Sequence, residues 1–228
     1  MKQDVRYGGN AMTQFALIAG AVILLCGLLY TEKSGNVTGV LLTKTPLSVL
    51  FVIAAMISAH PFPGYSRCIL TGLVLCLAGD VFLALPQRGM FLFGLLSFLL
   101  GHVLYIAAFV MVTRLGPLTW GACLLGGAFS TAVYVWLRPN LGTMNVPVIG
   151  YIVVITIMVV AASSVLGTRS LTLSGRVMVF AGAGLFYVSD VFVARDRFLK
   201  SDFSNRLIGL PLYYTGQFLL AFSTGSLA

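Results

Sequence analysis

The chain has 228 residues, of which 59% are hydrophobic and only 9% are charged. A soluble domain carries about 25% charged residues, so these proportions exclude a water-soluble enzyme, a secreted disulfide scaffold and a disordered tail. The net charge of +8 comes from basic residues scattered among the connections, which favours contact with lipid headgroups over binding to nucleic acid.

Apolar runs separated by glycine, proline and charged residues predict the membrane-spanning helices. A spanning helix needs about 20 mainly apolar residues. Eight candidates follow in chain order: 12–30, 44–59, 66–85, 90–112, 117–137, 146–166, 174–194 and 208–226. The connections are short, so we expect an all-α, polytopic membrane protein with eight transmembrane helices and a single transmembrane domain over residues 1–228.

Two pairs of short motifs indicate an internal repeat. Residues 79–84, at the end of the third predicted span, resemble residues 189–194, which lie 110 residues later. In the next span of each half, residues 101–104 resemble residues 216–219 at an offset of 115. Spans four apart point the same way, so we predict two parallel four-helix repeats, 12–112 and 117–226. Chance similarity between short apolar segments is the alternative.

Only two of the six acidic residues, Asp80 and Asp190, lie inside predicted spans. An even number of spans places both termini on one side of the membrane, here named side A, and both aspartates about 8 Å below the opposite boundary, side B. A carboxylate at this depth is costly, so it indicates function. Hydrogen bonding between helices is the alternative. The basic residues divide almost evenly between the sides, which leaves the orientation open.

Other polar side chains are expected in the same half of the bundle. Lys44 opens the second span from side B, and Tyr213, Tyr214 and Gln217 enter the eighth from that side. His102 and Tyr105 lie deeper in the fourth span, and Tyr187 shares a helix face with Asp190. Arg195 and Arg197 follow the seventh span, where they could hold a phosphate.

Each of these residues also has a structural interpretation. His102 could be a core histidine, and Lys44 could extend its ammonium group to the interface. The tyrosines of the eighth span could anchor the protein in the aromatic belt, and the arginines could belong to a solvated loop. The four cysteines lack metal-ligand spacing and only two histidines are present, so we expect no metal site.

The order of the motifs resembles that of a known family. Lys44-Thr45-Pro46 opens the second span, Gly79-Asp80 ends the third, and 101–105 (Gly-His-Val-Leu-Tyr) lies in the fourth. Ser189-Asp190 in the seventh span and 213–217 (Tyr-Tyr-Thr-Gly-Gln) in the eighth complete the pattern. Over residues 15 to 223 this order resembles the YhhN family of lysoplasmalogenases, small eight-span proteins of bacterial and animal membranes. Thr45 departs from the Lys-Pro pair of the family.

The resemblance implies hydrolysis of the sn-1 vinyl-ether bond of a lysoplasmalogen. The products would be a fatty aldehyde and glycerophosphoethanolamine or glycerophosphocholine. It also implies a lysophospholipid substrate among membrane lipids and no cofactor. We expect a multi-pass protein of the bacterial inner membrane rather than of an internal eukaryotic membrane. The oligomeric state is left open.

Vinyl-ether chemistry suits a pair of carboxyl groups. A proton adds to the β-carbon, and water captures the resulting oxocarbenium ion as a hemiacetal. In an apolar site, desolvation and mutual repulsion keep one carboxyl protonated while the other stays ionised, as in glycosidases. We therefore predict that Asp80 and Asp190 are catalytic, without assigning which is the acid.

The remaining candidates receive supporting roles. His102 and Tyr105 would position water or tune the proton, whereas Gln217 and Tyr213 would bind the glycerol backbone. Lys44 and the arginines of side B would face the phosphate.

Three other functions use similar residues. A small-molecule or proton-coupled transporter could also place acids and a histidine between repeats. An intramembrane aspartyl protease is disfavoured because Leu77 replaces the first glycine of its Gly-x-Gly-Asp motif. A purely structural membrane protein would leave the matched acids unexplained.

Overall fold

The structure, a computed structural model, describes residues 2–87 and 89–228, with side chains described from residue 12 onward. The described residues form helices and no β-strand, which confirms the predicted all-α class. The α-helices are α1 (Lys2–Ser34), α2 (Val37–Ile57), α3 (Pro63–Ala84), α4 (Met90–Val112), α5 (Pro117–Leu137), α6 (Asn145–Gly167), α7 (Leu173–Phe198) and α8 (Phe203–Ser226). Two short 3-10 turns, Arg138–Asn140 and Gly142–Met144, connect α5 to α6.

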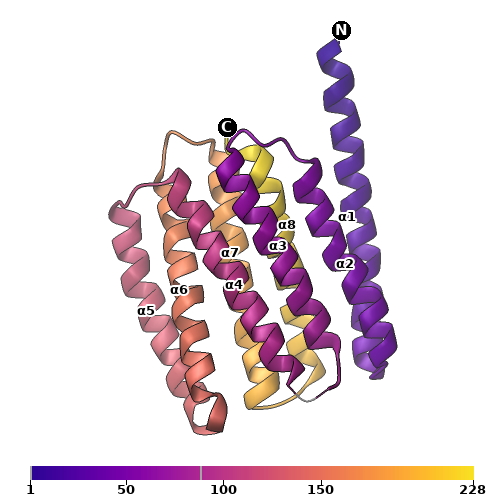
Figure 1. Cartoon of the computed structure of the whole chain (residues 1–228), viewed down its shortest axis with the longest axis vertical. Helices are drawn as coiled ribbons and strands as arrows, with labels where there is room; N and C mark the ends of the chain where they lie inside the picture. The colour runs from indigo at the N-terminus through magenta and orange to yellow at the C-terminus, as the bar shows by residue number, and fades with distance from the viewer. Residues whose placement is uncertain (1, 88) are drawn as a thin grey trace.

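The helices run alternately up and down, so both termini lie at the same end of the bundle, which is side A (Figure 1). Seven of the described helices, α1 to α7, are long and apolar enough to cross a membrane. These helices identify an integral, multi-pass membrane protein. α8 is not among the seven, although it has 24 residues.

Two helices begin earlier than the apolar runs predicted, because polar residues cap them. The side chain of Asn36 accepts a hydrogen bond from the backbone N–H of Gly39, so α2 begins at residue 37 rather than 44. The side chain of Asp202 caps α8 in the same way through Ser204, so α8 begins at residue 203 rather than 208. Such caps satisfy backbone donors that would otherwise lack a partner. Lys44 therefore lies well inside α2, not at its start.

The most extensive packing joins α3 to α4 and α7 to α8. In both pairs, glycines allow the backbones to approach closely. A Cβ atom at Gly101 of α4 would lie 3.1 Å from the carbonyl oxygen of Gly72 in α3. A Cβ atom at Gly182 of α7 would lie 3.0 Å from the carbonyl oxygen of Gly216 in α8. Larger side chains at these positions would separate the helices.

α8 is the central helix of the half of the bundle that holds the candidate site. It packs against α7, α2, α3 and α1, and Figure 1 shows it behind α3, between α7 and α2. A helix that is surrounded by other helices can carry polar side chains, because they meet protein rather than lipid. This position explains how α8 can carry buried polar residues such as Asn205 and Gln217.

Candidate active site

Asp80 lies in the last turn of α3 and is almost completely buried. Its Oδ1 atom lies 3.2 Å from the Nζ atom of Lys44 in α2. Its Oδ2 atom accepts hydrogen bonds of 2.6 Å from the hydroxyl groups of Ser48 in α2 and Tyr213 in α8. A cation and two hydroxyl donors all stabilise the ionised carboxylate.

This arrangement gives Lys44 a partner that the sequence did not indicate. The sequence placed its ammonium group at the side-B interface, whereas the structure buries it beside Asp80 with 7% of the residue exposed. Two charges at this depth are tolerated because they are paired and hydrogen-bonded.

A chain of hydrogen bonds links the hydroxyl of Tyr213 to Gln217 and Tyr105. The hydroxyl of Tyr105 in α4 donates to Oε1 of Gln217 at 2.9 Å, and Nε2 of Gln217 donates to the Tyr213 hydroxyl oxygen at 3.1 Å. Tyr214 contacts the Ser48 hydroxyl at 3.2 Å. The structure therefore brings Tyr105, Gln217 and Tyr214 close to Asp80, but as buried residues that hold other side chains.

Asp190 lies in α7, and its carboxyl group is surrounded differently. Its Oδ2 atom accepts a hydrogen bond of 2.5 Å from the hydroxyl of Tyr151 in α6. No ion pair involves Asp190 among the side chains that the structure describes. Asp190 is also more exposed than Asp80: Asp190 is partly buried, whereas Asp80 is almost completely buried.

The two aspartates line the same cavity, which has a volume of about 510 Å³ and opens at side B. Lys44, Tyr151, Tyr187 and Tyr213 also line it. Much of the remaining wall is apolar and includes Leu83, Leu95, Phe98, Leu137, Ile152 and Ile155. A few polar groups on an apolar wall are typical of a site that binds a small amphipathic molecule.

His102 does not line this cavity. It is fully buried in α4, where its ring lies 4.5 Å from the ring of Phe186 and 5.3 Å from that of Tyr151, measured between centroids. Neither ring nitrogen has a hydrogen-bond partner among the described residues. Its ring contacts Tyr151, whose hydroxyl donates to Asp190.

The last three predicted residues all belong to α7 and differ in whether they line the cavity. Tyr187 lines the cavity and its hydroxyl contacts that of Ser130 in α5. Arg197 also lines it, with its guanidinium 4.6 Å from the ring centroid of Phe91. Arg195 does not line the cavity; it donates to the side-chain oxygen of Asn205 at 2.8 Å and so braces α7 against α8.

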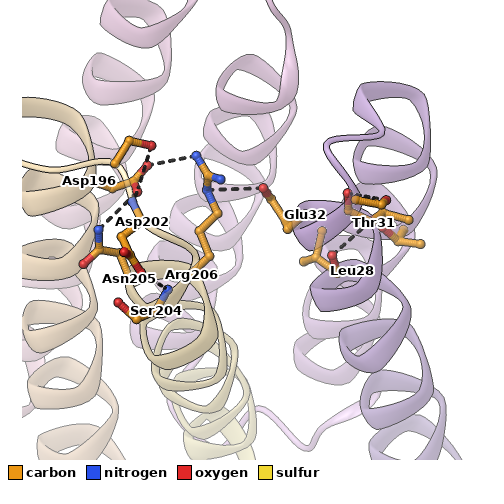
Figure 2. A network of polar contacts seen from close by, with 11 residues as sticks. Leu28, Thr31, Glu32, Asp196, Asp202, Ser204, Asn205 and Arg206 are labelled. Carbon is orange, nitrogen blue, oxygen red and sulfur yellow. Dashed lines mark hydrogen bonds and ion pairs between the residues drawn. The ribbon is translucent and has the colours of Figure 1, made fainter.

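An ionic network that the sequence did not predict surrounds the mouth. Figure 2 shows the Arg206 guanidinium group between Glu32 of α1 and Asp196 of α7. The distances are 3.3 Å from Nε to Glu32 and 3.0 Å from Nη2 to Asp196. Asn205 donates to Asp196 at 3.2 Å. All four residues line the cavity, so this network brings the Arg206 guanidinium group and two carboxylates to its opening.

Asp202 lies close to this network but outside the cavity lining. Hydrogen bonds from Ser204 lower the pKa of the Asp202 carboxyl below its usual value, because they favour the charged form. Asp202 caps α8, and its side chain is 41% exposed.

Sequence reasoning missed two residues that touch the aspartates. Ser48 lies four residues after Lys44, so it shares a helix face with that residue, which was a usable signal. Tyr151 lies six residues into α6, at a depth that matches Asp190 eight residues before the end of α7. Nothing local distinguishes it from other tyrosines.

The chain is similar to a known protein family and to several named relatives. The YhhN family model matches residues 40–224. A lysoplasmalogenase from Mycobacterium bovis is 28% identical over 214 residues, which cover 91% of this chain and 79% of that protein. The relative named lysoplasmalogenase TMEM86A from Bos taurus is 35% identical over 159 residues, 68% of this chain and 64% of its own length. The human protein of that name is 30% identical over 186 residues, 76% of this chain and 72% of its own length.

No solved structure matches the chain significantly. The family match spans most of the sequence and includes both aspartates, Lys44 and Gln217. The relatives agree with it across bacterial and mammalian proteins. The chain therefore belongs to the YhhN family.

Proposed function

We propose that this protein is a lysoplasmalogenase, which hydrolyses the sn-1 vinyl-ether bond of a lysoplasmalogen. The products are a fatty aldehyde and glycerophosphoethanolamine or glycerophosphocholine. Family membership and the names of the relatives support this reaction class. The observation that carries the proposal is the pair of carboxyl groups on one apolar cavity, of which only Asp80 has a cation beside it among the described side chains.

Asp190 is the proton donor in this proposal. It lines the cavity, and its one hydrogen-bond donor is a neutral phenol, Tyr151. Burial without a counter-ion disfavours a carboxylate, so a neutral carboxylic acid is the stable form in such surroundings. A neutral acid is what the first step requires, because the vinyl ether must be protonated on carbon.

Asp80 is the ionised partner. Lys44, Ser48 and Tyr213 hold its carboxylate in place, so it needs no reorganisation when positive charge develops on the substrate. From this position it stabilises the oxocarbenium ion and accepts a hydrogen bond from the water that attacks it. Lys44 therefore acts on Asp80 and not on the phosphate.

The reaction balances without a cofactor. The Asp190 proton is transferred to the β-carbon of the vinyl ether, and the electron pair of the double bond forms the new C–H bond. Water then adds to the α-carbon and gives up a proton, which returns to Asp190. The hemiacetal collapses to the aldehyde and the sn-1 alcohol of the glycerol.

The cavity walls suggest how the substrate lies. The alkenyl chain packs along Phe98 and Ile155, and the phosphate lies at the mouth near Arg197 and Arg206. Planar guanidinium groups suit phosphate oxygens. Tyr187 also lines the cavity and contacts the substrate there.

The buried residues behind the site act as positioning residues. Tyr105 and Gln217 orient the hydroxyl of Tyr213, and Tyr214 orients Ser48. His102 packs against the ring of Tyr151. This contact fixes the orientation of the Tyr151 ring and therefore the position of the hydroxyl that donates to Asp190. Arg195 holds the start of α8 through Asn205.

We propose two parallel repeats within one transmembrane domain, with α8 as the eighth membrane span. Matching contacts support them: α1 packs on α2 as α5 packs on α6, and α4 contacts α6 as α8 contacts α2. The paired glycines support them too, because Gly72 and Gly182 lie 110 residues apart and Gly101 and Gly216 lie 115 apart. These are the same two offsets that relate the sequence motifs. The proposed location is the bacterial inner membrane.

The test uses purified full-length protein in detergent with lysoplasmenylethanolamine and, separately, the matching 1-acyl lysolipid. Mass spectrometry should detect aldehyde from the first substrate and no fatty acid from the second. In H₂¹⁸O, rapidly reduced aldehyde should carry the label, because water adds to the oxocarbenium carbon. Absence of aldehyde, or accumulation of unchanged lysolipid in sealed vesicles, would contradict hydrolysis and favour a transporter.

A further inference from the structure

A second cavity lies at side A, at the opposite end of the bundle from the aspartates. Its volume is about 1240 Å³. It is lined by the end of α4, the start of α5, the end of α6 and the start of α7. In Figure 1 these ends lie at the same end of the bundle as the C-terminus, far from the turn between α7 and α8. The proposed hydrolysis makes no use of this cavity.

Three arginines line the side-A cavity: Arg114, Arg169 and Arg176. None of them makes an ion pair with any side chain between residues 12 and 228 that the structure describes. The acidic residues in that part of the chain all lie in the half of the bundle toward side B: Glu32, Asp80, Asp190, Asp196 and Asp202. The cavity thus concentrates positive charge in a half of the bundle where no acidic side chain lies among residues 12–228.

Arg176 is the most enclosed of the three. Its Nη1 atom donates to the carbonyl oxygen of Leu166 at 2.9 Å, which fixes the guanidinium group at the end of α6. Its Nε atom is buried and has no hydrogen-bond partner among the described residues. A buried charged donor without a partner is costly, so the site is incomplete without an acceptor.

The walls of the cavity are tied together by hydroxyl pairs. Thr113 of the α4–α5 connection contacts the Thr168 hydroxyl at 2.8 Å, and Thr119 of α5 contacts the Ser164 hydroxyl of α6 at 2.7 Å. The first residues of α5 also line the cavity. A helix N-terminus adds partial positive charge to that of the three arginines.

Large apolar side chains are exposed beside the arginines. Met111, Leu115 and Leu118 line the cavity and are 61%, 75% and 51% exposed. A soluble anion would gain nothing from them, whereas the acyl chains of a lipid would cover them. Basic pockets between helix ends at the membrane surface suit anionic headgroups.

We propose that this cavity binds the phosphate group of an anionic membrane phospholipid, with its acyl chains on the apolar side chains of α4 and α5. The guanidinium groups of Arg114, Arg169 and Arg176 contact the phosphate oxygens. Phosphate from a lipid and free phosphate share this chemistry, so the experiment must distinguish the two sources.

Trp120 provides a local reporter, because it follows Thr119 of the cavity wall and is 66% exposed. The chain has one other tryptophan, Trp136, which lies at the side-B end of α5 and is replaced by Trp136→Phe. The protein is placed in phosphatidylcholine vesicles that contain dibrominated phosphatidylglycerol or, at equal mole fraction, dibrominated phosphatidylcholine. Bromine quenches tryptophan fluorescence at short range.

The brominated phosphatidylglycerol should quench Trp120 more strongly than brominated phosphatidylcholine. Arg114→Gln and Arg169→Gln should each reduce the preference for the anionic lipid about fivefold. Arg67→Gln is the matched control, because Arg67 is exposed at side A but does not line the cavity. Circular dichroism verifies that each variant keeps its helices.

Equal quenching by the two brominated lipids would overturn the proposal. So would a preference that survives when Arg114→Gln and Arg169→Gln are combined in one protein, since the positive charge that selects the anionic lipid would then lie elsewhere. Inorganic phosphate at millimolar concentration should not relieve the quenching by phosphatidylglycerol. If it does, the site takes free phosphate, and the lipid assignment is wrong.

Discussion

Asp80 and Asp190 lie 110 residues apart in matching motifs, yet their carboxyl groups have different surroundings. Asp80 is paired with Lys44 and accepts two hydroxyl hydrogen bonds. Asp190 accepts one, from Tyr151. The two carboxyl groups are thus chemically distinct, and the difference lies in the neighbouring helices rather than in the aspartates.

The difference can be traced residue by residue. Tyr213 of α8 donates to Asp80, whereas the position 115 residues earlier, in α4, is Phe98 and has no hydroxyl. The preceding helix of each half also differs: α2 contributes Lys44 and Ser48, whereas α6 contributes Tyr151. In the proposed mechanism, these differences between the two halves keep Asp80 ionised and Asp190 neutral.

Asp190→Asn should have the largest effect on catalysis. It removes the proposed proton donor and keeps the size of the side chain, so aldehyde release should fall about 10²- to 10⁴-fold while the protein remains folded. Mass spectrometry of the aldehyde provides the measurement. Asp202→Asn is the matched control, because asparagine also caps a helix. Near-normal turnover by Asp190→Asn would show that Asp190 is not the proton donor.

Asp80→Asn should combine a loss of activity with a loss of stability. It leaves the ammonium group of Lys44 buried without its partner, which should lower the free energy of unfolding by about 3–5 kcal/mol. Thermal unfolding in detergent provides the measurement.

The double variant Lys44→Met with Asp80→Asn separates the two effects. It removes both charges, so stability should recover while aldehyde release stays low. Recovery of activity together with stability would show that Asp80 has a structural role only. The proposal that the ionised Asp80 takes part in catalysis would then be wrong.

Tyr151→Phe should have an intermediate effect. The variant removes the one hydroxyl that orients Asp190, and a lost hydrogen bond of about 1–1.5 kcal/mol corresponds to about a tenfold lower kcat. Steady-state kinetics of Tyr134→Phe, a hydroxyl of α5 that lies outside the cavity lining, should match the unmodified protein. A Tyr151→Phe enzyme of full activity would show that Asp190 is oriented by other contacts.

Arg206→Gln should have the smallest effect and should change KM rather than kcat. Arg206 is about one-third exposed, so solvent screening limits its contribution to about 1 kcal/mol, or about fivefold in KM. Arg138→Gln is the control, since that residue is exposed at the same end but does not line the cavity. An equal fall in kcat would instead place Arg206 in the chemical step.

The sequence predicted the helical class and the placement of both aspartates on one cavity, because ionisable residues in apolar runs are conspicuous. It predicted the starts of α2 and α8 less well, because a count of apolar residues overlooks polar first turns capped by Asn36 and Asp202. It failed for Tyr151, whose role depends on which helix packs against α7. Such pairing is set by tertiary contacts that no single run of residues reveals.

Glu32 has a further consequence, since α1 precedes the region matched by the family model at residues 40–224. One of the two carboxylates that contact Arg206 is therefore supplied by a helix outside the region that the family model matches. In the proposed function, a substitution at Glu32 changes the surroundings of Arg206, and hence those of the headgroup, without changing any residue that contacts the aspartates.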